Sequence, residues 1–495
     1  MSLALIIIYG LFLLFIFFYS IVQLTLVLNY KKSQKQCQDE CKSMKDAFGD
    51  EANFPKVTIQ LPVFNELYVV ERLIDSVSQM DYPRDKFEIQ VLDDSTDESF
   101  QIAANKIEEI QKKGIDIKHV KRPNRVGFKA GALAYGLTQT DSEFTAIFDA
   151  DFLPKSDFLM RTLPFFKDDN IGVVQTKWEH INEDYSLLTR LQAFGLDAHF
   201  TVEQKGRNAG GHFINFNGTA GIWRRTCIEE AGGWQSDTLT EDLDLSYRAQ
   251  LKGWKFKYLE EVGAPAELPA AMNALKNQQY RWTKGAAECA VKNLPKVLKK
   301  RKIGFSTKLH AIFHLMNSFI FICIISTALL SVPMLFIKEN SPEFSLLFKI
   351  ASLFLLSFVI LSYFYWVSMS RESQDKFKSF WEFIILFPMF LSVSMGLSLH
   401  NAIAVVEGYI GRKTPFVRTP KFNITDQKDG FSSNIYSIRK VSPITFIEGL
   451  MAIYFLGGMG TAIYLNDFGL FPFHLMLFIG FSIVCFYSFK HARAN

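Results

Sequence analysis

The chain has few cysteines and almost no net charge, and both scarcities restrict what it can be. Six of its 495 residues are cysteine, and none belongs to a C-x-x-C pair. Because disulfide frameworks and zinc sites place cysteines in pairs, we interpret these residues as reduced thiols in a cytosolic region. The formal net charge is only +4, which argues against a nucleic-acid partner. The cysteines are Cys37, Cys41, Cys227, Cys289, Cys323 and Cys485.

Long apolar runs, in contrast, are abundant. Hydrophobic residues make up 49% of the chain, and phenylalanine alone contributes 48 residues. The run Leu3–Leu28 is long enough to span a bilayer. We predict a membrane helix here rather than a signal peptide, because a positively charged start and a small-residue cleavage site are missing. The other runs predicted to span a bilayer are His310–Ile337, Leu346–Ser368, Ile444–Leu465 and Phe471–Phe489.

One further apolar run, Phe380–Val406, is long enough to span but is more amphipathic, with Glu382 near its start. If it crossed the membrane, the basic loop 411–440 would lie on the opposite side from the basic residues at 31–35 and 292–302. Basic residues next to membrane helices prefer the cytoplasmic side. We therefore predict five spanning helices, one interfacial helix over 380–406, and an N-terminus outside the cytoplasm.

Between about residues 53 and 302 the pattern is that of a soluble α/β protein. Strand-like runs alternate with helical patterns, which predicts a parallel sheet covered on both faces. In such sheets ligands bind beyond the carboxyl ends of the strands, where the sequence places the acidic groups of LDD (92–94) and DAD (149–151). The predicted strands are 57–64, 87–94, 115–122 and 144–151, and the predicted helices include 66–80 and 98–114.

Seven motifs in this region carry the chemistry. They are PVFNE (62–66), LDDSTD (92–97), FKAGAL (128–133), FDADF (148–152), FNGTAG (216–221), TEDLDLS (240–246) and QQYRW (278–282). Their order and spacing resemble the family 2 inverting glycosyltransferases, the GT-A fold of membrane polysaccharide synthases. The resemblance covers about residues 53–302 and extends more loosely into the membrane part. Within that group the chain is most similar to the cellulose-synthase-like A proteins, the mannan and glucomannan synthases, through HFTVEQ (199–204), AGGW (231–234), LKGWKF (251–256) and ELP (267–269).

The resemblance implies a fold class and a division into domains. We expect a cytosolic α/β GT-A domain, Rossmann-like and nucleotide-sugar-binding, inserted in an α-helical transmembrane domain. The last region should include the interfacial helix 380–406 and a gating-type loop at 411–422. The expected parts are a transmembrane helix (1–30), a linker (31–52), the GT-A domain (53–269), interfacial helices with QQYRW (270–308) and a transmembrane region (309–495).

Asp149 and Asp151 stand two residues apart at the end of an apolar strand. Aspartate is also an ordinary turn residue, so the pair alone has two interpretations. Two carboxylates at a strand end can converge on one divalent cation, which can hold a diphosphate. A sugar nucleotide needs such help, because its leaving group bears several negative charges. We therefore expect Mn²⁺ or Mg²⁺ as cofactor on Asp149 and Asp151, with Asp151 preferred as the direct ligand.

The resemblance also implies a set of donor-binding residues. Asp93 or Asp94 should accept hydrogen bonds from the base or ribose of the nucleotide. Lys129 and Arg281 can meet the diphosphate, although an ordinary exposed lysine is the alternative for Lys129. The expected donor-binding set is Asp93, Asp94, Lys129, Asp149, Gln278 and Arg281.

The acceptor is a sugar hydroxyl, a weak nucleophile that needs a general base. Asp242 of the TED motif is our candidate, and Glu241 and Asp244 are its rivals. Thr240 and the acidic residues after it also fit the start of a capped helix, and the two roles are compatible. Single displacement inverts the anomeric carbon, so an α-linked donor gives a β-linked product.

Four residues are expected on the acceptor side. Trp282 offers a flat face to a sugar, although tryptophan also anchors helices at membrane interfaces. Asn217, Gly218 and Thr219 should shape the acceptor pocket, because small residues let the backbone approach a sugar closely.

The segment TPFVRTPK (414–421) resembles the F-x-V-T-x-K gating loop of processive synthases. Phe416, Thr419 and Lys421 match, while Arg418 replaces the usual valine. By analogy the loop covers the occupied donor site and excludes water. The alternative is a basic loop that binds lipid head groups.

Together these features predict a processive inverting glycosyltransferase of the EC 2.4.1 class. It would make a β-linked mannan, glucomannan or glucan from GDP-mannose or UDP-glucose and thread the polymer through the membrane. The alternative is a single-transfer enzyme that acts on a membrane lipid such as ceramide or polyprenol phosphate. The expected partners are the nucleotide-sugar donor, a polysaccharide or glycolipid acceptor and the lipid bilayer of a bacterial inner membrane or the Golgi, with the catalytic domain cytoplasmic.

Overall fold

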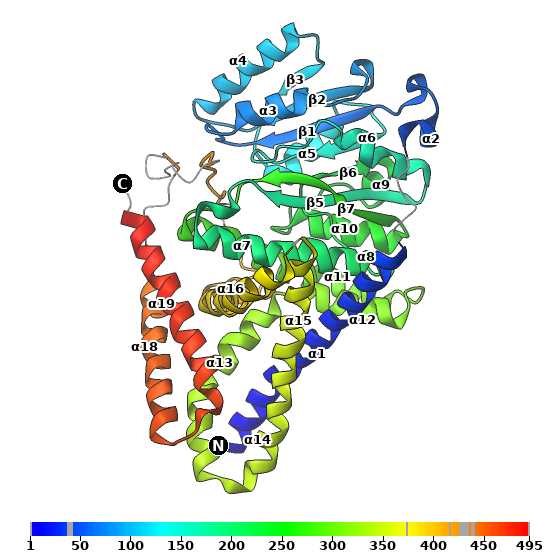
Figure 1. Cartoon of the computed structure of the whole chain (residues 1–495). Helices are drawn as coiled ribbons and strands as arrows, with labels where there is room; N and C mark the ends of the chain where they lie inside the picture. The colour runs from blue at the N-terminus through cyan, green and yellow to red at the C-terminus, as the bar shows by residue number, and fades with distance from the viewer. Residues whose placement is uncertain are drawn as a thin grey trace.

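The structure is a computed structural model that describes residues 2–36, 43–372, 375–414, 417–424, 435–436 and 441–493. It consists of a sheet with its covering helices and a bundle of long helices, with α7 (Leu187–Ala198) and α16 (Lys376–Gly396) lying between them (Figure 1). Cys227, Cys289, Cys323 and Cys485 are free thiols, in line with the expected reduced state. Cys37 and Cys41 lie outside the described residues.

Within the described residues, the sheet has seven strands in the order β3-β2-β1-β4-β6-β5-β7. The four predicted strands are confirmed within a few residues, and β1, β2, β3 and β4 are parallel to one another. The expectation of an all-parallel sheet is wrong for β6, which runs antiparallel to both β4 and β5. The strands are β1 (Val57–Val63), β2 (Phe87–Asp93), β3 (Ile117–Val120), β4 (Phe144–Ile147), β5 (Ile171–His180), β6 (Gly221–Arg224) and β7 (Lys255–Ala266).

Helices cover both faces of this sheet, as the sequence predicts. Apolar residues of α3 (Val70–Ser78), α4 (Ser99–Lys112) and α6 (Phe158–Thr162) belong to one buried core. Those of α5 (Phe128–Leu137) and α10 (Glu241–Lys252) belong to a second core, together with the large buried ring of Trp223. The short helices α2 (Met44–Phe48), α8 (Lys205–Ala209) and α9 (Arg225–Glu230) complete this region.

Within the part of the chain that the structure describes, six helical segments are long and apolar enough to cross a membrane. They include all five predicted spans, extended or shortened at their ends. The predicted span His310–Ile337 is divided at residues 316–318 into α12 (Phe305–Leu315) and α13 (Phe319–Asn340). The six segments are Ser2–Lys35, Phe319–Asn340, Pro342–Arg371, Lys376–Gly396, Pro443–Tyr464 and Phe468–Ala492.

The run predicted as one interfacial helix, 380–406, forms two helices that meet at Leu397. They are α16 and α17 (Ser398–Tyr409). Figure 1 shows α16 nearly end-on, across the direction followed by α1 (Ser2–Gln36), α15 (Leu355–Glu372), α18 (Pro443–Tyr464) and α19 (Phe471–Arg493). By length and composition alone α16 is nevertheless one of the six segments able to span. Its position in a membrane therefore stays a prediction.

One long helix, α11 (Met272–Lys299), joins the sheet region to the bundle. Its buried Lys276 extends Nζ to Glu448 Oε2 of α18 at 2.5 Å and to Ser488 Oγ of α19 at 3.1 Å. Such a buried pair is costly to break, because removing one partner leaves an uncompensated charge. α11 is therefore fixed to α18 and α19 at the turn just before the QQYRW motif.

Lys276→Met is expected to destabilise the protein by about 3 kcal/mol, since Glu448 loses its buried partner. Thermal unfolding of the detergent-solubilised protein measures the effect. The double variant Lys276→Met/Glu448→Met should recover most of the loss, because it removes both charges. Lys112→Met is the control, since the Lys112–Glu108 pair is exposed and its loss should leave the melting temperature almost unchanged. An unchanged melting temperature for Lys276→Met would contradict this account.

Candidate active site

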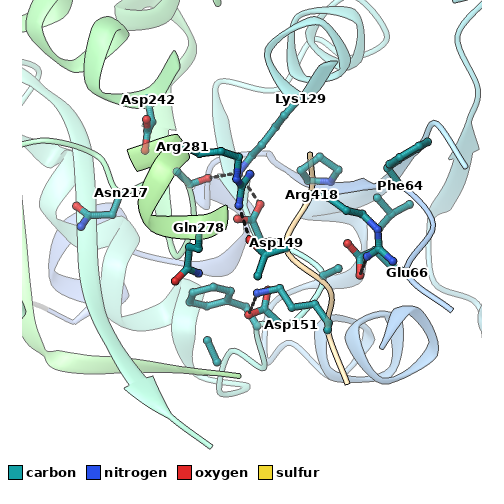
Figure 2. A pocket seen from close by; sticks show the side chains of 18 of the residues that line it. Phe64, Glu66, Lys129, Asp149, Asp151, Asn217, Asp242, Gln278, Arg281 and Arg418 are labelled. Carbon is teal, nitrogen blue, oxygen red and sulfur yellow. Dashed lines mark hydrogen bonds and ion pairs between the residues drawn. The ribbon is translucent and has the colours of Figure 1, made fainter. Parts of the chain in front are cut away.

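The candidate site is a cleft at the carboxyl ends of the parallel strands. The reversed strand β6 contributes to the same edge by its beginning, because Gly221 pairs with Ile147 at the end of β4. The FNGT segment before β6 therefore faces the DAD segment after β4. Figure 2 shows the resulting order: Asn217 and Asp242 at one end, Asp149, Asp151, Lys129 and Arg281 in the middle, and Phe64, Glu66 and Arg418 at the other end.

The DAD turn follows directly from the end of β4, and both of its aspartates line the cleft. Asp149 donates its backbone N–H to Thr219 Oγ1 at 2.9 Å, which fixes the turn against the FNGT segment. Each carboxylate has a lysine partner: Asp149 Oδ1 lies 2.5 Å from Lys129 Nζ, and Asp151 Oδ2 lies 2.6 Å from Lys421 Nζ.

The aspartate pair fits a divalent cation in the chemistry of its ligands. Carboxylate oxygens suit Mg²⁺ and Mn²⁺, and Mg²⁺ is commonly bound by one or two carboxylates together with substrate phosphates. Among the described residues no group of three or more histidine, cysteine or acidic side chains is arranged to hold a metal. A cation on Asp149 and Asp151 would therefore need further ligands from the substrate or from water.

Lys129 is part of the site rather than an ordinary surface lysine. It lies in the first turn of α5 and also donates to the carbonyl of Gly218 at 2.9 Å. Burial lowers the pKa of Lys129, but the Asp149 and Glu241 carboxylates outweigh burial and the net pKa lies above its ordinary value. Arg281 lines the cleft beside it and donates to Thr419 Oγ1 at 2.8 Å. The two cations are thus held where a diphosphate can accept from both.

The three acidic residues of the TED segment have different environments. Glu241 and Asp242 line the cleft, whereas Asp244 is fully buried and accepts from Arg248, Lys292 and Asn293. Thr240 is the N-cap of α10 but makes no side-chain capping bond. Burial, and after it the Glu241 carboxylate, raise the pKa of Asp242 to about 7. A carboxylate with that pKa suits a general base that works near neutral pH.

The structure separates the two aspartates at the end of β2. Asp93 is buried, accepts from the backbone N–H of Ser95 at 2.8 Å and lies 2.9 Å from His119 Nε2. Asp94 lines the cleft, and Arg122 holds both of its oxygens, at 2.7 and 2.5 Å. Asp94 is therefore in a position to contact a ligand, while the buried Asp93 stabilises the turn that follows β2.

Comparison with known proteins places this chain. The family described as glycosyltransferase like family 2 matches residues 55–285. The chain is 32% identical over 450 residues to glucomannan 4-beta-mannosyltransferase 1 of Cyamopsis tetragonoloba, a match that covers 87% of this chain and 81% of that protein. The chain belongs to glycosyltransferase family 2.

A second relative in family 2 is more similar but is matched over a shorter part. Glucomannan 4-beta-mannosyltransferase 2 of Arabidopsis thaliana is 42% identical over 298 residues, which is 59% of this chain and 56% of that protein. The chain thus spans little more than half the length of this relative. Among solved structures, a mannosyltransferase from Pyrobaculum calidifontis in complex with GDP-Man and Mn²⁺ is similar with a TM-score of 0.53 at 18% identity. That match covers 83% of this chain and all of the other, and it supports the GT-A-like fold.

Of the four residues expected to contact the acceptor in this family 2 site, three line the cleft and one is buried behind it. Asn217, Gly218 and Trp282 line the cleft. A Cβ atom on Gly218 would lie 3.1 Å from Asp242 Oδ2, so a larger residue there would press on the candidate base. Thr219 is fully buried and supports the DAD turn through its hydroxyl instead of facing the cleft. Gln278 lines the cleft as expected.

Of the gating-type loop 411–422, the structure describes residues 411–414 and 417–422, and the second of these parts lies against the cleft. Thr419 and Lys421 line it as predicted, and Phe416 lies outside the described residues. Arg418, which departs from the family pattern, also lines the cleft, with Nη1 2.9 Å from Glu66 Oε2. The carboxylate of Glu267 accepts the backbone N–H groups of Phe422 at 2.8 Å and Asn423 at 2.9 Å. The loop is therefore tied to the rim of the sheet at several points.

Sequence reasoning missed several residues of the cleft. Glu66 and Glu267 stand in the PVFNE and ELP motifs, which carried the resemblance but received no role. Arg125 lies with Cζ 3.3 Å from the ring centre of Phe64, so a planar cation and a ring stack at one end of the cleft. Trp178 follows from β5, a strand that the sequence analysis did not identify, and its ring centre is 6.4 Å from that of Trp282.

Proposed function

We propose that this family 2 protein is a processive inverting glycosyltransferase. It takes a nucleotide sugar, GDP-mannose or UDP-glucose, and extends a β-linked mannan or glucomannan that passes between its membrane helices. The names of its relatives support the choice of a mannosyl donor. The observation that carries the proposal is a second cavity among the helices that adjoins the acidic cleft and shares lining residues with it.

The second cavity shares Leu196, Gln278 and Trp282 with the cleft. From there it extends between α7, α11, α13, α16 and α17, and its lining is mainly apolar and aromatic, with Gln192 and Asn401 among the polar side chains. We infer that a sugar attached next to Asp242 moves into this second cavity and along the helices instead of returning through the donor site. A single-transfer enzyme has no need of such a path.

The cleft has carboxylates that can hold a divalent cation and basic side chains that can bind the negatively charged diphosphate. Asp149 and Asp151 would hold the divalent cation, which supplies neutralisation of the diphosphate. Lys129 and Arg281 bind the diphosphate oxygens, and Asp94 orients the nucleoside. Loop residues Thr419 and Lys421 close the cleft over the donor and exclude water.

Transfer is a single displacement at the anomeric carbon. Asp242 accepts the proton of the acceptor hydroxyl as its oxygen forms a bond to that carbon. The bond from the carbon to the diphosphate breaks, and its electron pair leaves with the diphosphate toward Lys129 and Arg281. Trp282 supports the acceptor ring, and Gly218, which has no side chain, leaves room beside Asp242.

We further propose the membrane topology that the basic residues favour. α1, α13, α15, α18 and α19 span the bilayer, α16 lies in the interface, and the sheet domain is cytoplasmic. The position of α16 across the other helices in Figure 1 supports this assignment.

The test is purified protein supplied with a panel of radiolabelled nucleotide sugars and Mn²⁺ or Mg²⁺. We expect a product of many sugars with β-linkages, seen by gel separation and linkage analysis. Addition of one sugar to a membrane lipid would favour the single-transfer alternative, and incorporation from none of the donors would overturn the proposal.

The pH dependence of transfer follows from the raised pKa of Asp242. The base must be ionised, so kcat/KM should fall about tenfold per pH unit below pH 7 and level off above it. Glu241→Gln removes a charge that raises this pKa, so its residual activity should decline at lower pH than in the wild type. Nucleotide release measured from pH 5 to 9 gives both profiles. A flat profile between pH 5 and 7 would exclude Asp242 as the titrating base.

A further inference from the structure

The segment HFTVEQ (199–204) takes no part in the transfer chemistry described above, yet it lies directly behind the site. It forms a single π-helical turn between α7 and α8, and Phe200, Thr201, Val202 and Gln204 within it are buried. π-helical turns are rare and occur often at functional sites. The hydrogen bonds of a π-helical turn join residues five apart, and His199 and Gln204 have this spacing. Both side chains contact the side chain of Asn217.

The amide of Asn217 has only one orientation in this arrangement. Gln204 Nε2 donates to the backbone carbonyl of Asn215 at 2.9 Å, so this atom is the amino group of Gln204. The same Nε2 is 2.6 Å from Asn217, which must therefore present its oxygen there. The amino group of Asn217 consequently faces His199 Nε2, at 3.0 Å.

The tautomer of His199 follows from the same contacts. Nε2 must accept from the Asn217 amino group, so the ring proton lies on Nδ1. Nδ1 is 2.8 Å from Glu203 Oε2, a carboxylate that can only accept when ionised. Burial raises the pKa of Glu203, but the Arg207 charge and the bond from His199 outweigh burial, and the net pKa lies well below its ordinary value. Arg207, itself buried, holds the other oxygen of Glu203 at 2.5 Å.

Asn217 connects this chain of contacts to the reacting groups. Its neighbour Gly218 has no side chain and lies close to Asp242. The backbone carbonyl of Gly218 accepts a hydrogen bond from Lys129.

We propose that His199 and Glu203 are positioning residues for the sugar acceptor. Glu203 keeps the proton of His199 on Nδ1, and His199 in turn holds the Asn217 amide so that its second N–H serves an acceptor hydroxyl. This inference rests on the proposed function, because the acceptor is the sugar that the enzyme extends.

Two substitutions at one position separate positioning from simple packing. His199→Phe keeps a ring but removes the acceptor for Asn217. His199→Gln restores an acceptor oxygen near the position of Nε2. We expect His199→Phe to raise the KM for a soluble β-linked manno-oligosaccharide at least about tenfold, which corresponds to one hydrogen bond, while His199→Gln stays within about threefold of wild type. The KM for the nucleotide sugar and its slow hydrolysis should not change in either variant.

A double-mutant cycle with Asn217→Ala measures the coupling between the two residues, which a general packing role of His199 would not produce. If His199 acts through Asn217, the two losses in acceptor affinity are strongly non-additive. His212→Phe is the matched control, because His212 is also half-buried but bonds Thr307 at 3.2 Å and lies outside the cleft. It should leave acceptor KM unchanged.

Oligosaccharide binding in the absence of donor keeps the two proposals distinguishable. The cleft tryptophans Trp178 and Trp282 report binding by fluorescence. If the wild type binds the oligosaccharide but transfers no sugar, the proposed function fails while a weaker Kd for His199→Phe still supports the positioning role. The inference would be overturned if His199→Phe kept the wild-type KM and Kd for the oligosaccharide. It would also be overturned if the variant lost affinity for the nucleotide sugar and for the oligosaccharide to the same extent.

Discussion

Asp242→Asn is expected to lower kcat for sugar transfer by at least about 1,000-fold while the nucleotide sugar still binds. The amide keeps the size of the side chain but cannot accept the proton of the acceptor hydroxyl. Donor affinity should change much less than kcat, because the substitution leaves Asp149, Lys129 and Arg281, the residues proposed to hold the cation and the diphosphate, in the cleft. Labelled sugar incorporation measures kcat, and calorimetry with the nucleotide product measures binding.

A matched control lies two residues further along the same helix. Asp244→Asn should lower thermal stability, because Arg248 and Lys292 lose the buried charge that they share. Its kcat per folded molecule should stay within about threefold of wild type, since Asp244 does not line the cleft. If Asp242→Asn retained transfer and Asp244→Asn lost it in folded protein, the assignment of the base would be wrong.

Removal of divalent metal is expected to reduce transfer at least about 100-fold, because the diphosphate then leaves without its main neutralising charge. Chelation by EDTA followed by Mn²⁺ or Mg²⁺ should abolish and then restore incorporation. Asp149→Asn and Asp151→Asn should each have a comparable effect that added metal does not reverse.

Asp157→Asn is a suitable control for this series, since Asp157 lies on the same stretch of chain but pairs with Arg161 at a half-exposed position. Its activity and metal requirement should equal those of the wild type. Full transfer activity in excess chelator would remove the metal-holding role of the DAD turn.

The first half of the sheet and the centre of the site could be predicted from the sequence because their signals are local. Apolar runs end in acidic residues at β2 and β4, and strands that are parallel bring those ends to one edge. This pattern points to Asp149 and Asp151, and both line the cleft.

The second half of the sheet escaped prediction for physical reasons. The direction of β6 depends on its pairing with β4 and β5, which are distant in sequence, and no local pattern reveals that pairing. Thr219 stands just before β6, so its burial beneath the DAD turn follows from that reversal. Trp178 pairs with β7 and lies near Trp282, a contact between residues distant in sequence. The difference between Asp93 and Asp94, in contrast, is the alternation of side chains along a strand and was open to inference.

The break between α12 and α13 shows a limit of hydropathy. His310 and His314 lie in an apolar run but are buried in polar company, with His314 Nδ1 2.8 Å from the hydroxyl of Tyr247. Average hydrophobicity over a window does not reveal a partner on another helix, so the run was assigned to one span.

The buried contact of Lys276 with α18 and α19 has a consequence for the surroundings of the protein. The helix that presents Gln278, Arg281 and Trp282 shares a rigid joint with two segments able to cross a bilayer. A lipid environment of different thickness changes the tilt of such segments at small energetic cost. With the proposed topology, a change in the tilt of α18 and α19 would reach the wall of the cleft that holds Arg281 and Trp282, so the thickness of the host membrane would influence the geometry of the candidate site.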